Sequence, residues 1–400
     1  NDEPTTVLVT EGGAKGLPGD DGTDGTGFNS VRMQKLNNPL LHIFKTNQLT
    51  NTIAPGNVDA DLTWTRASAA NYVDRYGVIQ SAAIDVPREE SEGWLIEGAS
   101  TNDALWSEDF SNGAWGATNI TVTANTVTAP DGTTTADTLL ATASNGQVQQ
   151  LTAAQTIGDV LTSSVWIKRK TGTGAVYLKA GNNSTGTDLA ITSEWARYSY
   201  VGDALTSTTV RCSVLLATSG DEVYVWGAQI EELEFASSYI GETTSSAVTR
   251  SQDKVSVAIN NNVALSPTSI AVEFNLIGEN TGNNFIYGNG TSATDVFSYV
   301  YAGGFNAVRF GDQNTQSGAV ATPNQTHSTV ATSSLTEMNL YFNGSLSDTE
   351  VASSSDFIQA DTVFSLGSHD VSFTSPMYGH LKDFRIYDFE LNADEAEYLA

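Results

Sequence analysis

Tryptophans in polar surroundings are the residues of this sequence best suited to hold a ligand. Trp106, Trp115 and Trp195 lie in the loop-like segments NDALWSED, NGAWGATN and TSEWARY. The face of an aromatic ring can stack on the apolar face of a sugar, while neighbouring Asn, Asp and Gln groups hydrogen-bond its hydroxyls. These three tryptophans are therefore candidate carbohydrate contacts. Packing in a core is the alternative for each of them.

A second group of aromatic and polar residues lies in the C-terminal third of the chain, in the segment YVYAGGFNAVRFGDQN. Short strands joined by Gly303 and Gly304 would bring rings and hydrogen-bonding groups together there. Some of these side chains must pack a core, so only part of the set is available to a ligand. The candidate binding residues are Tyr299, Tyr301, Asn306 and Asp312.

Hydrolytic chemistry has little support in this sequence. The four histidines show neither H-x-H nor H-E-x-x-H spacing, and no G-x-S-x-G nucleophile turn occurs. Paired carboxylates for glycoside cleavage could come from PREESEGWLIEG, which holds Glu89, Glu90, Glu92 and Glu97. Acidic clusters of this kind are usually solvated. We therefore expect no catalytic residues and no enzyme activity.

The composition limits the elements that must position these residues. A length of 400 residues suggests two or three domains, and 40% hydrophobic residues with 35 glycines favour β-sandwiches with many turns. The net charge of −28 opposes binding to nucleic acid. No signal peptide is evident and no apolar run approaches about 20 residues, so no membrane insertion is predicted. The single cysteine, Cys212, alternates with apolar residues, which predicts a buried thiol.

A collagen-like repeat near the N-terminus predicts three chains wound together. Glycine recurs at every third position of GAKGLPGDDGTDG, and only glycine fits at the crowded axis of a collagen triple helix. A flexible linker is the alternative. The apolar but irregular residues 28–49 could add a trimer interface or a strand that caps the next domain. The trimerising residues would be Gly13, Gly16, Gly19, Gly22 and Gly25.

Short apolar runs separated by turn residues predict an all-β chain with two tandem jelly-roll-type sandwiches. Asn343-Gly344 predicts a two-residue hairpin turn, and Asn392 with Glu395 predicts the capping box of a short C-terminal helix. The predicted domains are a collagen-like tail (1–28), a leader or trimer-interface segment with short strands (29–98), a first sandwich (99–245) and a second sandwich (246–400).

Several segments together resemble the receptor-binding tail fibres of bacteriophages. WTRASAANYVDRYGVIQSA and GWLIEGASTN resemble the leader of carbohydrate-binding-module-like sandwiches in such proteins. SSVWIKRK, VYLKAG and VYVWGAQIEELEFASSYI are similar to that sandwich, and VTRSQDKVSV resembles the exit from it. LYFNGSL, FSLGSHD and GHLKDFRIYDFELNADEAEYL resemble the closing pattern of laminin-G/concanavalin-A-like domains.

The resemblance implies a homotrimeric, extracellular virion protein that recognises host surface polysaccharide and contacts other virion tail proteins. A purely structural fibre, decoration or connector protein is the alternative, and a glycan-degrading tailspike is less favoured. The resemblance also implies a core position for Trp226. It further implies one possible cofactor, a structural calcium held by Glu108, Asp109 and Glu231 or Glu232, with solvated acids as the alternative.

Overall fold

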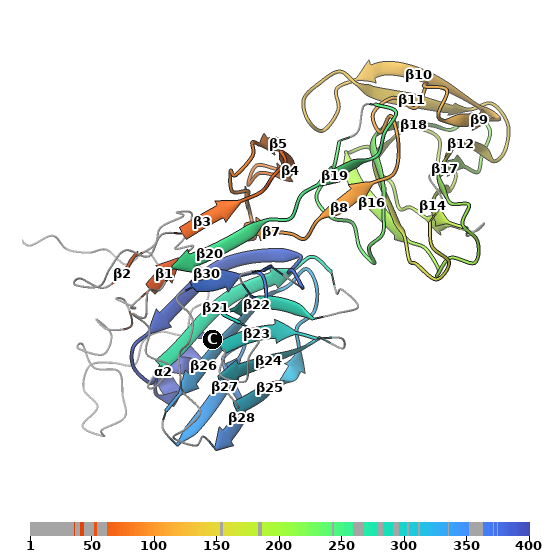
Figure 1. The fold of residues 1–400 in the computed structure, drawn as a ribbon. Coiled ribbons are helices and arrows are strands. Elements are labelled where there is room, and N and C mark those ends of the chain that lie inside the picture. The colour runs from red at the N-terminus through yellow and green to blue at the C-terminus, as the bar shows by residue number, and fades with distance from the viewer. Residues whose placement is uncertain are drawn as a thin grey trace, which may run out of the picture.

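The computed structural model describes most of the chain from residue 62 onward. It also describes Leu36 and two short strands before that point. The stretches outside the description after residue 62 are 153–154, 183–185, 242–243, 259–267, 279–282, 291–295, 302–303, 311–312, 335, 352–362, 371 and 374. The collagen-like glycines at 13–25 lie outside the described residues. The predicted all-β class is confirmed, because antiparallel sheets pack as two sandwiches (Figure 1).

The smaller sandwich, which we call the inserted sandwich, has two five-stranded sheets. One sheet has the order β10 (Ile120–Val127), β11 (Ala136–Ala141), β18 (Glu222–Glu231), β13 (Thr162–Thr171) and β16 (Ala196–Val201). The other has the order β15 (Thr187–Asp188), β14 (Val176–Gly181), β17 (Arg211–Leu216), β12 (Gly146–Leu151) and β9 (Gly116–Thr118).

Strand alternation builds the core of the inserted sandwich. In β12, Val148 and its neighbours two positions away are buried, while the residues between them are partly exposed. Val148 packs in one apolar cluster with Leu178, Val214 and Val225 from other strands. Cys212 belongs to the same cluster, as predicted, and burial raises the pKa of its thiol to about 11.

The larger sandwich, which we call the host sandwich, contains strands from both ends of the chain. One sheet has the order β2 (Thr52–Ile53), β1 (Leu41–Ile43), β30 (Gly379–Tyr387), β21 (Thr268–Leu276), β26 (Thr326–Ser333), β27 (Glu337–Phe342) and β28 (Ser345–Val351), with β7 (Gly93–Ile96) on β30 and β6 (Glu89–Glu90) on β7. The other has the order β25 (Gln313–Val320), β24 (Phe305–Phe310), β23 (Val296–Val300), β22 (Asn284–Gly288), β29 (Val363–Leu366), β20 (Lys254–Ala258) and β3 (Leu62–Thr65).

The predicted domain boundaries need a correction. Residues 62–98 are not part of a separate leader, because β3 pairs with β20 and β7 pairs with β30 within the host sandwich. Trp64 and Ile96 from these strands are buried in the same core as Phe274 and Phe384. The inserted sandwich therefore interrupts the host sandwich between β7 and β20. The two strands that lead into and out of it, β8 (Ser100–Asn102) and β19 (Val248–Arg250), pair with each other and form a neck (Figure 1).

Two local sequence signals are confirmed. Asn343 and Gly344 both have positive φ, 47° and 75°, which matches the twist that a two-residue hairpin needs between β27 and β28. Helix α2 (Ala393–Leu399) begins at Asn392, and the reciprocal hydrogen bonds of a capping box join Asn392 and Glu395. Within the described residues, no helix is long and apolar enough to cross a membrane.

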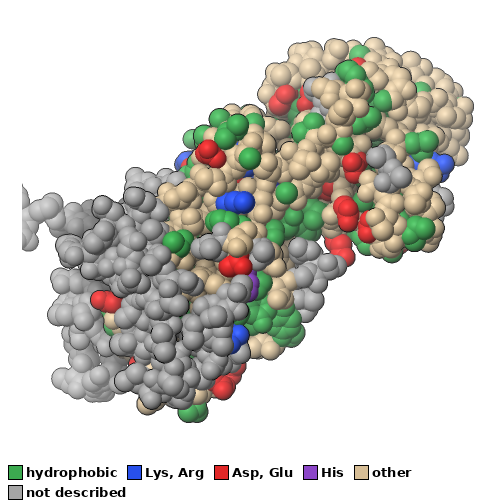
Figure 2. All heavy atoms as spheres, viewed as in Figure 1, with side chains coloured by type: hydrophobic (Ala, Val, Ile, Leu, Met, Phe, Trp, Pro, Cys, Tyr) green, Lys and Arg blue, Asp and Glu red, His purple; other side chains and the backbone are tan. Residues whose placement is uncertain are grey.

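A small hairpin of β4 (Ala70–Val73) and β5 (Ile79–Ala82) lies beside the neck (Figure 1). Its tip residue Tyr76 is 83% exposed. Other large apolar side chains are also exposed there, and Figure 2 shows hydrophobic atoms gathered over this part of the surface. The exposed apolar residues of the hairpin region are Val73, Tyr76, Val78, Ile84 and Val86.

Candidate functional site

A row of aromatic rings covers the outer face of one sheet of the host sandwich. Along β23, Val296 and Val300 point into the core, so Phe297, Tyr299 and the following Tyr301 share the opposite face. Ring centroids lie 5.7 Å apart between Phe297 and Tyr299, and 6.1 Å apart between Tyr299 and Tyr301. The row, which we call the aromatic ladder, consists of Phe285, Phe297, Tyr299, Tyr301 and Phe305.

Polar groups flank the aromatic ladder. The His369 ring lies 4.2 Å from Phe285, and the Arg309 guanidinium lies 5.6 Å from the centroid of Phe297. Tyr299, Tyr301 and Phe305 are half-buried, so part of each ring is available to a ligand. Burial raises the pKa of Tyr299, which keeps its phenol neutral as a hydrogen-bond donor. The ladder therefore combines stacking faces with hydrogen-bonding groups.

The structure divides the predicted binding residues of the C-terminal segment. It brings Tyr299 and Tyr301 together as neighbours in the ladder. Asn306, however, is fully buried, and its amide donates to Ser298 Oγ at 3.0 Å and to the Tyr299 carbonyl oxygen at 3.2 Å. Its prediction as a ligand contact is wrong, because the side chain is fully buried within the sheet and no ligand can reach it. Asp312 lies outside the described residues.

Phe285, Phe297, Phe305, Arg309 and His369 belong to this site but are not among the predicted binding residues. Phe297 could have been predicted from the sequence, since it precedes Tyr299 by two positions on a strand and must share its face. Phe285 and His369 come from β22 and from the loop after β29. Nothing in their local sequence places them beside the tyrosines, because that proximity depends on strand order.

Trp115 is a structural residue, which corrects its prediction as a binding residue. Its side chain is only 4% exposed and packs 4.7 Å from the Phe110 ring in the core of the inserted sandwich. Its Nε1 donates to the carbonyl oxygen of Trp106 at 3.2 Å. Trp106 is itself partly buried against the same core. The polar neighbour Ser111 is exposed, while the Trp115 ring turns inward.

Trp195 also packs against protein. It borders a cluster of Trp166, Trp226 and Tyr239, and its Nε1 donates to the Thr128 carbonyl oxygen at 3.1 Å. Lys168 Nζ lies 4.9 Å from the centroid of the Trp195 ring, a cation–π arrangement. The expected core position of Trp226 is confirmed, with 1% of its surface exposed.

The predicted calcium ligands do not come together in one site. Glu108 accepts a hydrogen bond from the Tyr239 hydroxyl, and Asp109 accepts from Ser111. Glu231 is buried, where its carboxylate accepts from Ser100 and Ser237 hydroxyls, both at 2.6 Å. Within the described part of the chain, no three His, Cys, Asp or Glu residues are placed to hold a metal ion. The calcium prediction is therefore wrong for this carboxylate set.

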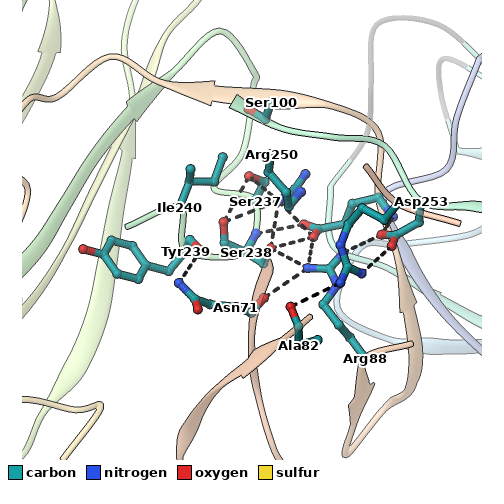
Figure 3. Close-up of polar contacts among 12 residues, drawn as sticks. Asn71, Ala82, Arg88, Ser100, Ser237, Ser238, Tyr239, Ile240, Arg250 and Asp253 are labelled. Carbon is teal, nitrogen blue, oxygen red and sulfur yellow. Dashed lines mark hydrogen bonds and ion pairs between the residues drawn. The ribbon is translucent and has the colours of Figure 1, made fainter. Parts of the chain in front are cut away.

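A buried cluster of charges lies where the neck meets the host sandwich (Figure 3). Asp253 pairs with Arg66, at 2.9 Å, and with Arg88. Glu97 pairs with Arg88 at 2.8 Å and with Arg250 at 3.0 Å. All five side chains are almost fully buried. We call Arg66, Arg88, Glu97, Arg250 and Asp253 the junction network.

The junction network is bonded to the end of the inserted sandwich. Glu97 accepts hydrogen bonds from the backbone N–H and hydroxyl of Ser238, at 2.8 and 2.7 Å. Burial alone would raise the pKa of Glu97, but Arg250 and Arg88, together with Ser238, lower it to about 2. The charges are thus paired with one another rather than presented to a ligand. The network fixes how the inserted sandwich joins the host sandwich.

The C-terminal part of the chain is similar to a known protein family. Residues 242–397 match the family model described as the concanavalin A-like lectin/glucanases superfamily. The host sandwich has a concanavalin A-like fold. The matched region covers the C-terminal part of the host sandwich and contains the aromatic ladder. Strands β3 and β7 lie outside the matched region. A search of curated protein sequences found no match to the chain.

Three solved structures illustrate the similarity to part of the chain. One is a heptameric SAP-like pentraxin from Limulus polyphemus, with 15% identity over 32% of this chain and 67% of that one, at a TM-score of 0.28. Another is the receptor-binding domain of a botulinum neurotoxin C/D mosaic serotype (16%, 36% and 39%, TM-score 0.29). The third is the CBM40 of Ruminococcus gnavus IT-sialidase bound to α2,3 sialyllactose (17%, 34% and 82%, TM-score 0.30).

Proposed function

We propose that this chain is the receptor-binding protein of a homotrimeric phage tail fibre, and that it recognises host surface glycan through the aromatic ladder. The observation that carries the proposal is the ladder itself, which lies on a sandwich of the lectin-like family. Half-buried rings with flanking hydrogen-bonding groups suit the alternating apolar and polar faces of a sugar. The protein would act outside the cell, on the virion.

The trimer is supported by the sequence of the collagen-like repeat at 13–25. Three linked copies would raise the avidity of a weak site by roughly 10²–10⁴. Light scattering should give about three times the chain mass of 42.4 kDa. Gly19→Val should disrupt the triple helix while both sandwiches keep their melts. A wild-type protein that is monomeric at micromolar concentration would remove the collagen-like trimer from the proposal.

Glycan binding is tested with ring deletions in the ladder. Tyr299→Ala and Tyr301→Ala should each weaken binding to host polysaccharide roughly tenfold per site, because a stacked ring contributes about 1–2 kcal/mol. Tyr76→Ala removes a highly exposed ring elsewhere and serves as the matched control. Thermal melts of all three variants report folding. If both ladder variants bind like the control, the ladder is not the glycan site.

We further propose that the chain binds glycan without cleaving it. Incubation with host polysaccharide should release no reducing sugar above the level of a heat-denatured sample. The second candidate function is a structural fibre component that contacts other virion proteins. The exposed apolar residues of the β4–β5 hairpin favour it, since such patches often mark protein contacts. Inhibition of phage adsorption by the purified protein supports the first function and not the second.

A further inference from the structure

A cavity of about 280 Å³ opens where the hairpin, the inserted sandwich and the host sandwich meet. It is separate from the aromatic ladder, and residues of the ladder do not line it. The hairpin contributes Tyr72 and Ile79, the inserted sandwich contributes Trp166, and the host sandwich contributes Ile277 and Asn324. Its volume is near the lower end for small-molecule sites, which is about 300 Å³. It therefore suits a ligand of one ring rather than an extended chain.

In the wall of this cavity Glu90 is paired with His380, whereas the described hydrogen bonds of Arg197 go to neutral oxygen atoms. Arg197 donates to the Ser237 carbonyl oxygen at 2.6 Å and to Ser164 Oγ at 2.9 Å. Glu90 accepts from His380 Nε2 at 2.9 Å and from the Val73 N–H. The chain as a whole carries a charge of −28, which repels anions. A neutral ligand is therefore favoured over an anion, because the net charge of the chain does not repel it.

Both polar and apolar groups line the cavity. Ile79, Ile277 and the edge of Trp166 give apolar contacts. Within the described residues, the side chains of Tyr72 and Asn324 make no hydrogen bond, so their polar groups are available to a ligand. The Asn71 amide donates to the Tyr239 carbonyl oxygen, which leaves its oxygen as an acceptor (Figure 3). Hydroxyl groups around an apolar ring match this pattern.

We propose that the cavity is a second binding site, for a single neutral pyranose unit. This site does not depend on the aromatic ladder. It would hold one sugar ring between two sandwiches, whereas the ladder would contact a polysaccharide along one face. An experiment can therefore refute one of the two proposed binding sites without refuting the other.

The test titrates the full chain with methyl α-D-glucopyranoside, methyl β-D-galactopyranoside and N-acetylglucosamine, and with sodium glucuronate as the charged probe. Calorimetry measures affinity, and the change in total tryptophan fluorescence gives a second titration curve. Ala236 lines the cavity, so Ala236→Trp should fill it and weaken the binding of a neutral sugar at least roughly tenfold. Ala117→Trp is the control, because it adds the same ring at an exposed residue of β9.

Asn324→Gly is a second variant at an exposed position, and glycine adopts the φ of 60° at this residue without strain. It should weaken binding roughly threefold or more through the loss of a hydrogen bond. The double variant Tyr299→Ala with Tyr301→Ala should bind the monosaccharide as wild type does. The proposal is overturned if no neutral probe saturates the protein, if glucuronate binds more tightly, or if the ladder variant alone loses the monosaccharide. It is also overturned if Asn324→Gly and a folded Ala236→Trp both bind normally.

Discussion

Asp253→Ala should destabilise the host sandwich strongly. Asp253 Oδ1 accepts from Arg66 at 2.9 Å and from Trp64 Nε1 at 3.3 Å, while Oδ2 accepts from Arg88 and from the Glu97 N–H. The carboxylate thus links β3, the segment after β7 and the segment before β20. Its removal leaves two buried guanidinium groups short of their counter-charge.

The magnitude follows from burial. Breaking a buried ion pair by deleting one partner costs about 3–5 kcal/mol, because the remaining charge stays desolvated. For a unit of roughly 200 residues, each kcal/mol lowers the melting temperature by about 2–4 °C, so the expected fall is about 6–20 °C. Calorimetry of the full chain measures the shift. Urea unfolding followed by tryptophan fluorescence gives the free energy of unfolding independently.

Glu273→Ala is the matched control. Glu273 pairs with Lys382 at 2.8 Å in the same sandwich, but both side chains are substantially exposed. An exposed pair contributes about 0–1 kcal/mol, so this variant should melt within a few degrees of wild type. If Asp253→Ala and Glu273→Ala shift the melt equally, the junction network does not hold the host sandwich together. An Asp253→Ala protein that melts like wild type would refute the reasoning.

Three other features give predictions of their own. Fragment 99–245 should melt cooperatively, whereas fragment 250–400 should show no cooperative circular-dichroism melt, because it lacks β3 and β7; a cooperative melt of the second would contradict the insertion. Trp115→Ala should lower the free energy of unfolding of the inserted sandwich by about 3–5 kcal/mol in urea, with unchanged polysaccharide binding per folded molecule. Burial raises the pKa of Asp137 to about 6. The stability that Asp137 contributes is therefore complete below about pH 4 and lost as pH rises through 6; melts of fragment 99–245 from pH 4 to 7 check this, and Asp137→Asn should abolish that part of the slope.

Local signals in the sequence predicted local structure well. Asn343-Gly344 defines a hairpin because two consecutive residues must adopt positive φ, and few residue pairs do so easily. Asn392 and Glu395 define a helix start because their bonds form within one turn. The strands of the inserted sandwich were also visible, since alternation along one strand is a local property.

The insertion could not be predicted in the same way. Trp64 pairs in register with Val255, and Trp94 pairs with Leu381, so their partners lie about 190 and 290 residues away. A strand pattern says which face is buried but not which strand covers it. The same limit explains why the burial of the tryptophans was not predicted. The surroundings of Trp115 in the sequence are polar, while its burial depends on Phe110 folding back beneath it.

The neck has a mechanical consequence. The chain enters the inserted sandwich through β8 and leaves it through β19, and these strands lie side by side and antiparallel. A pull on the inserted sandwich therefore stretches both connections along one direction instead of peeling one strand from the other. The strand before the neck, β7, belongs to one sheet of the host sandwich, and the strand after it, β20, belongs to the other. Tension is thus divided between the two sheets, and neither sheet bears the whole load at its edge.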